Sequence, residues 1–184
     1  NSSNLSDCND LTSFDEYIEK MQSEQEKIYF CVADTFEAAI NSPHIEKLKS
    51  NGIEVLLLTD RIDEWLMTNI FEYKGKQLVN VAKEEISNES KDSNVSDIDK
   101  DIIKKIKSHL GDKVSDVLVS ERLIDSASCL ILPQSEPGAQ LRKILEASGQ
   151  NFGDSKPIFE INLKHKLLKK LKDLKGKQFN LFVD

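Results

Sequence analysis

The residues best suited to acid–base chemistry are three carboxylates between positions 60 and 64: Asp60, Asp63 and Glu64. A small hydrolytic or other enzyme could use such acids, provided that a pocket perturbs the pKa of one of them. Acids are also favoured at the start of a helix, because they cap its amides and complement its dipole. No nucleophile, base and orienting group occur together as a catalytic set. The three acids therefore predict a helix start, and catalysis remains an alternative.

The other residues that could do chemistry stand alone. No histidine belongs to an HExxH motif, the three cysteines form no CxxC pair, and no GxxxxGK[ST] or GxGxxG phosphate-binding turn occurs. We therefore expect structural, reduced thiols, and no catalytic residue, metal or cofactor in this chain. The residues in question are His44, His109, His165, Cys8, Cys31 and Cys129.

Composition indicates a soluble globular protein. The 184 residues are 39% hydrophobic and 31% charged, with 25 basic and 32 acidic side chains and a net charge of −7. No apolar run is long enough for a transmembrane helix, and residues 1–10 lack the pattern of a signal peptide. Nucleic-acid binding needs clustered Lys and Arg, which a net negative charge disfavours. We expect a cytoplasmic protein without nucleic-acid or membrane partners.

Strand and helix signals alternate in the first half of the chain. After a tail over 1–12, expected to be disordered, Ser13 and Glu16 form a capping box. Residues 53–58 are almost uniformly apolar, as in a parallel strand buried on both faces. The order predicts a small three-layer α/β/α unit over 13–84. Its expected elements are helices over 13–21, 34–40, 43–51 and 60 or 63 to 70, and strands over 27–32 and 53–58.

A linker and a mixed α+β domain are expected to follow. Residues 83–101 contain seven acids against three lysines, and the Ser/Asn/Asp-rich part over 85–96 is typical of a solvated linker. Residues 163–177 contain seven lysines against one acid, typical of the wet side of an amphipathic helix or of a basic binding face. The domain over 97–184 should contain helices over 97–110, 138–148 and 165–174 and strands over 114–119, 127–131 and 157–161.

One stretch carries a family resemblance. Residues 52–65 read GIEVLLLTDRIDEW, preceded by EKIYF at 26–30 and SPHIEKLK at 42–49. This resembles the ninety-kilodalton heat-shock chaperone family in its bacterial HtpG form. The similarity is collinear from about Ser13 to Lys172 and is weaker in the second half. It includes SFDEYIEKM, FEYKGKQLVNVAKE, SERLIDSASCLIL, LRKILEASGQ and IFEINLKH, where NLKH departs from the family's NPDH.

The resemblance implies a fragment of a larger chaperone. Residues 13–84 would be the end of the middle domain, and 97–184 a truncated C-terminal domain without its final dimerisation helices. ATP and Mg would bind in an absent N-terminal domain, so the parent would be an ATPase and this fragment no enzyme. The partners implied are unfolded or partly folded client proteins, and co-chaperones are possible. The parent would be a homodimer, and the fragment could be a monomer.

The resemblance also places a client-binding site on two helices. The corresponding residues are Glu64, Trp65 and Thr68 on the first, and Leu141, Ile144 and Leu145 on the second. We predict that Trp65 and Leu141 are partly exposed and face one cleft. In the alternative, these apolar residues are ordinary core. A further possibility is a structural connector that transmits ATP-driven motion between domains.

Overall fold

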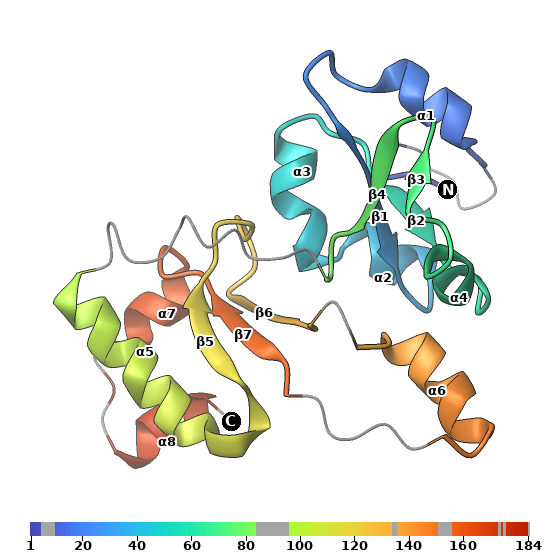
Figure 1. Ribbon diagram of the computed structural model, residues 1–184. Helices are drawn as coiled ribbons and strands as arrows, with labels where there is room; N and C mark the ends of the chain where they lie inside the picture. The colour runs from blue at the N-terminus through green and yellow to red at the C-terminus, as the bar shows by residue number, and fades with distance from the viewer. Residues whose placement is uncertain are drawn as a thin grey trace.

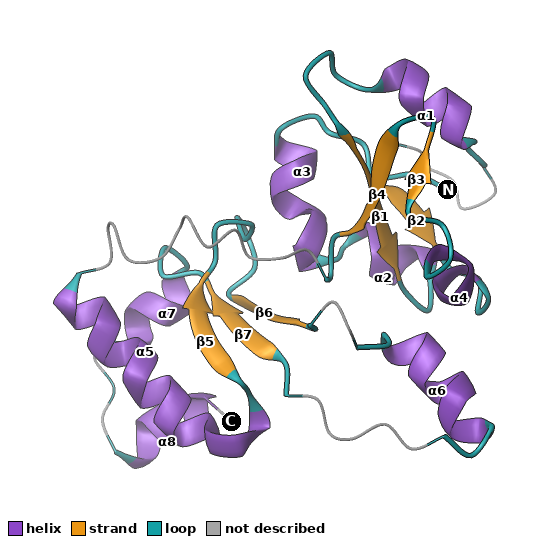
Figure 2. Cartoon of the chain, viewed as in Figure 1, coloured by secondary structure: helices purple, strands orange, loops and turns teal. Residues whose placement is uncertain are grey.

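The computed structural model describes residues 1–4, 10–83, 96–133, 136–150, 156–172, 174 and 176–183. They form two lobes, each built on one small sheet with helices (Figures 1 and 2). We call residues 1–83 the first lobe and residues 96–183 the second lobe. The expected combination of α/β and α+β folds is confirmed.

The first lobe contains a four-stranded sheet in the order β2-β1-β4-β3. Strand β1 is parallel to β2 and β4, and β3 is antiparallel to β4. The strands are β1 (Lys27–Val32), β2 (Leu56–Leu58), β3 (Glu72–Tyr73) and β4 (Lys76–Asn80), and the helices are α1 (Phe14–Lys20), α2 (Phe36–Ile40), η1 (Pro43–Ile45), α3 (Glu46–Ser50) and α4 (Asp63–Met67).

Alternation along β1 creates the three layers. Ile28 and Phe30 pack on one face with Tyr17 from α1 and Met67 from α4. Cys31 points to the other face, where the core includes Ala39 from α2 and Ile45 from η1. Side chains of a strand alternate between the two faces of the sheet. A central strand with apolar residues at both odd and even positions therefore needs helices on both faces. The expected α/β/α unit is confirmed.

The helix caps and element bounds predicted for the first lobe agree with the structure to within a few residues. Ser13 and Glu16 form the expected capping box. Gly52 adopts a φ of 71° just after α3, the left-handed geometry that suits glycine. The helix expected over 34–40 begins later, at Phe36, and Thr35 caps it by accepting a hydrogen bond from the amide of Ala38. The predicted strand over 53–58 is regular only from Leu56 to Leu58.

The expectation of disorder over 1–12 is wrong for residues 1–4. The amide of Leu57 donates to the carbonyl of Asn1 at 2.9 Å, and the amide of Ser3 donates to the carbonyl of Val55 at 2.8 Å. Ser2 is fully buried and its hydroxyl donates to Glu54. The polar side chains of this segment suggested disorder, but residues 1–4 pair with the open edge of β2 through backbone groups, which every residue has.

The second lobe has a three-stranded sheet in the order β5-β7-β6, with β7 parallel to β5 and antiparallel to β6. The strands are β5 (Asp116–Val119), β6 (Ser128–Ile131) and β7 (Ile158–Ile161), and the helices are α5 (Asp97–Leu110), η3 (Gly111–Lys113), α6 (Ala139–Ala147), α7 (Lys166–Leu171) and α8 (Lys177–Val183). The predicted linker lies outside the described residues, except for Ser96, which caps α5.

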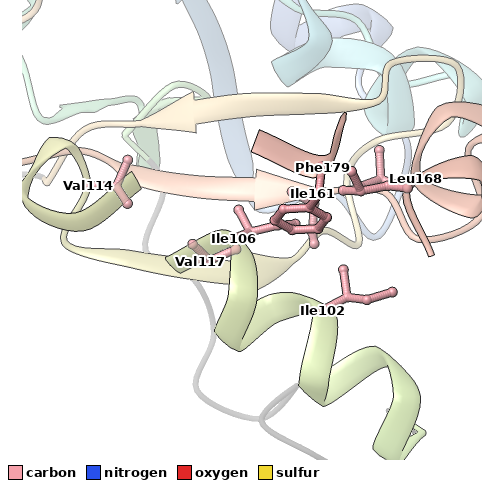
Figure 3. Packing of buried hydrophobic residues seen from close by; sticks show 8 residues of the cluster. Ile102, Ile106, Val114, Val117, Ile161, Leu168 and Phe179 are labelled. Atoms are coloured by element: carbon pink, nitrogen blue, oxygen red, sulfur yellow. The ribbon is translucent and has the colours of Figure 1, made fainter. Parts of the chain in front are cut away.

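Helices α5, α7 and α8 cover one face of this sheet. Ile106 and Ile161 lie at the centre of the core, and Phe179 from α8 completes it (Figure 3). Helix α8 was not predicted, because the segment is short and adjoins the lysine-rich run over 163–177. Ile98, in the first turn of α5, is 67% exposed and lies outside this core. The lysines over 164–172 are exposed.

Candidate functional site

The lobes are joined first by Glu46, at the start of α3. Its carboxylate accepts hydrogen bonds from the amides of Ile124 (2.6 Å), Asp125 (2.9 Å) and Ser126 (3.1 Å), and from the Ser126 hydroxyl. Burial raises the pKa of Glu46, but these donors outweigh it and hold the pKa below its ordinary value of 4.5. A charged carboxylate of the first lobe thus binds a loop of the second.

Arg122 makes a second connection. Its Nε lies 3.2 Å from an oxygen of Glu160, which is almost fully buried in β7 and also accepts from the Ser120 hydroxyl at 2.7 Å. Its Nη1 donates to the carbonyl of Val81 in the first lobe at 2.6 Å. The guanidinium therefore neutralises a buried acid of one lobe and binds the backbone of the other.

A cavity of about 410 Å³ lies at this junction. Ala33, His44 and Lys83 line it from the first lobe, and Leu130 and Pro157 line it from the second. Burial, and then repulsion by the Arg122 cation, lowers the pKa of His44 from 6.5 to about 4. The histidine is therefore neutral near pH 7.

The described cysteines, Cys31 and Cys129, are buried free thiols, as expected of structural residues. Burial raises the pKa of the Cys31 thiol. Burial and the neighbouring carboxylate of Glu160 raise the pKa of Cys129 to about 12. Both thiols are protonated near neutral pH and are poor nucleophiles.

A third junction lies between α4 and α6, and Glu64 is at its centre. One oxygen of Glu64 accepts from the amide of Gly138, and the other accepts from the amide of Leu141 at 2.8 Å. The Lys83 ammonium lies 3.5 Å away, and Glu64 itself is 4% exposed. Sequence reasoning placed Glu64 among the client contacts, but the structure buries it beneath α6.

Trp65 points the other way. Successive residues of a helix are rotated by about 100°, so Glu64 can face α6 while Trp65 faces solvent. Trp65 is 53% exposed, as predicted, and its neighbours Ile62 and Leu66 are 63% and 44% exposed. Thr68 is exposed, and its hydroxyl donates to the Trp65 carbonyl at 2.7 Å. Ile62 and Leu66 were missed, although their place beside Trp65 was a signal.

The three predicted client-binding residues of α6 differ in how far they are exposed. Ile144 is 44% exposed and Leu145 is half-buried. The prediction that Leu141 is partly exposed is wrong: it is 7% exposed, because it stands at the docked first turn of α6. A wide groove of about 990 Å³ between the loop before α4 and the end of α6 is lined by Ile62 and Ile144, with Asp34 and Lys143 at its rim.

The carboxylate cluster has structural roles. Asp63 accepts from the amide of Asp60 at 2.9 Å, next to the start of α4. Both oxygens of Glu64 are bound by amides of α6. Among the described residues, no three or more His, Cys, Asp or Glu side chains gather as metal ligands. Within the same ranges, no helix combines the length and apolarity that crossing a bilayer requires.

The family model for Hsp90 protein matches residues 1–180. The chain belongs to the Hsp90 family. Hsp90 relatives named "Chaperone protein HtpG" include those of Dechloromonas aromatica, 45% identical over 168 residues (87% of this chain, 26% of the relative), and of Legionella pneumophila strain Paris, 42% identical over 177 residues (93% and 28%). The protein from Shewanella halifaxensis is 41% identical over 174 residues (90% and 27%). This Hsp90 chain thus spans about a quarter of these relatives' length.

Proposed function

We propose that this chain is a segment of an ATP-dependent chaperone and that the exposed apolar side chains of α4 and α6 bind unfolded or partly folded client proteins. Membership of the Hsp90 family supports the chaperone role. The observation that carries the binding role is the half-exposed Trp65 on the short helix α4, together with the exposed Leu66 on the same helix and the exposed Ile62 at its N-cap. We call Ile62, Trp65, Leu66 and Ile144 the apolar surface.

The apolar surface suits a promiscuous binder. Contiguous exposed apolar side chains mark interaction sites, because leaving them in water is unfavourable. An indole offers a large contact area with few rotatable bonds, which suits partners of many sequences. The open groove between Ile62 and Ile144 leaves room for an extended segment.

Nucleotide chemistry belongs to another part of the proposed parent protein. The described residues offer no cluster of acids that would hold Mg²⁺, and the sequence offers no glycine-rich phosphate loop. The resemblance to the family supports the proposal that ATP and Mg²⁺ bind in a domain outside this chain. The parent would be a cytoplasmic, stress-induced homodimer.

Trp65→Ala tests client binding. With reduced, carboxymethylated α-lactalbumin as an unfolded probe, we expect at least about a tenfold rise in Kd, because a half-exposed indole acts as a hot spot. The free energy of unfolding should change by less than about 1 kcal/mol. Ile98→Ala is the matched control, since Ile98 is exposed on α5, outside the apolar surface. Unchanged affinity together with a large loss of stability would support the core alternative instead.

A role as connector is the second candidate, favoured by the bonds of Glu46 and Arg122 across the lobes. A connector needs lobes that move together, and the contacts of Glu46 and of Arg122 across the junction would hold the two lobes together. In a chain that binds no client, Trp65→Ala would change nothing, whereas Glu46→Gln would loosen the lobes.

A further inference from the structure

The buried contact between Glu64 and the start of α6 is not itself part of the apolar surface proposed to bind clients. We propose that Glu64 is a positioning residue: it clasps α6 to the first lobe and so holds Ile144 across the groove from Ile62, without touching the client. This inference rests on the proposed function and assigns a task within the same site. We call the contact of Glu64 with Gly138 and Leu141 the clasp.

The hydrogen bonds and the ion pair of the Glu64 carboxylate are all made within the protein, so it is not available to bind a client. Its two oxygens accept from the amides of Gly138 and Leu141, and Lys83 neutralises its charge from 3.5 Å. At 4% exposure, the carboxylate lies out of reach of a bound chain. A direct contact would require the clasp to open first.

The first turn of α6 needs an acceptor from elsewhere. The first amides of a helix have no partner within it, and the residue at the N-cap usually supplies one. Here the N-cap is Gly138, which has no side chain for capping. Glu64 of another helix takes that place, and its negative charge suits the positive end of the α6 dipole.

Gly138 is matched to the clasp by size. A Cβ at this position would lie 2.8 Å from Cδ of Glu64, closer than side chains tolerate. Its φ of −71° and ψ of 178° are open to any residue, so the backbone does not require glycine here. The close approach of the carboxylate does.

The clasp matters because α6 stands apart from the rest of its lobe. Figure 1 shows α6 beneath α4, well away from α5, α7 and α8. Another charged contact of α6 with the first lobe, Lys143 with Asp34 at 3.7 Å, joins two exposed side chains and contributes little. The position of Ile144 relative to Ile62 across the groove therefore depends on Glu64.

Two substitutions break the clasp from opposite sides. Glu64→Gln removes the charge and one acceptor, whereas Gly138→Ala removes the space and keeps the carboxylate. Glu136→Gln is the matched control, because Glu136 pairs with Arg142 of α6 at 3.3 Å without touching Glu64. Each clasp variant should speed hydrogen exchange at the amides of Gly138 and Leu141 but not in β1. Each should weaken binding of reduced, carboxymethylated α-lactalbumin about tenfold, the effect of one lost charged hydrogen bond.

Comparison of the variants decides the matter. The double variant should bind the probe no more weakly than either single variant, because both changes break one contact. If Gly138→Ala accelerates exchange yet binds the probe normally while Glu64→Gln binds poorly, Glu64 touches the client and the clasp proposal is overturned. If the Trp65→Ala variant binds the probe with normal affinity, the proposed client surface itself is wrong, and this result is independent of the clasp.

Discussion

Arg122 and Glu160 form a pair whose cation also reaches the neighbouring lobe. The guanidinium Nε is 3.2 Å from the Glu160 carboxylate in β7, and its Nη1 donates to the Val81 carbonyl after β4. A buried acid is costly unless it is paired, so this arginine serves the core of one lobe and the junction with the other. The two lobes are therefore coupled through Arg122, and replacing it would destabilise both the core of the second lobe and the junction between the lobes.

Arg122→Leu should lower the free energy of unfolding by about 3 kcal/mol, because it leaves Glu160 charged and buried without its partner. Urea unfolding at pH 7 measures this. Lys107→Met is the control, since Lys107 and Asp116 form a half-exposed pair 2.6 Å apart that should contribute less than about 1 kcal/mol. Equal losses in both variants would contradict the distinction between buried and exposed pairs.

Glu46→Gln should weaken the lobe junction by about 1 kcal/mol at pH 7, because an amide replaces a charged acceptor of several donors. The pKa of Glu46 is lowered in the folded chain, so its contribution is present above the ordinary value of 4.5 and is lost as the pH falls below it. Urea midpoints of both proteins from pH 7 to pH 3 should converge in acid. A constant difference across this range would exclude the charge as the cause.

His44 should make the folded chain acid-sensitive at a higher pH than Glu46 does. Its pKa falls from 6.5 to about 4 on folding, so below pH 6.5 the unfolded chain binds a proton that the folded chain refuses. Stability should drop by about 3 kcal/mol between pH 8 and pH 4 on this account. His44→Gln should remove that part of the pH dependence. Parallel stability curves for the two proteins would show that His44 is not buried neutral.

Leu141→Ala and Ile144→Ala should separate packing from binding on one helix. Leu141 is buried, so truncation should cost about 2 kcal/mol or more, read as faster hydrogen exchange across α6. Ile144 is 44% exposed, so its truncation should leave exchange nearly unchanged and weaken binding of the unfolded probe instead. The reverse pattern would mean that α6 presents the opposite face to solvent.

The sequence by itself determined the local elements and the family. Period-2 and helical patterns, the capping box at Ser13, the stop at Gly52 and the apolar run before Asp60 depend on neighbours within a few residues, so they can be read from the chain alone. The exposed Trp65 was also foreseen, through the resemblance to the family.

Only the tertiary structure decided what those elements touch. Residues 1–4 pair with β2, and Leu141 is buried where exposure was expected. Glu64, a plausible surface acid in the sequence, binds amides 74 and 77 positions away. Backbone donors are the same in every residue, so no sequence pattern shows which distant amide a carboxylate will meet; that depends on how two helices are brought together in space.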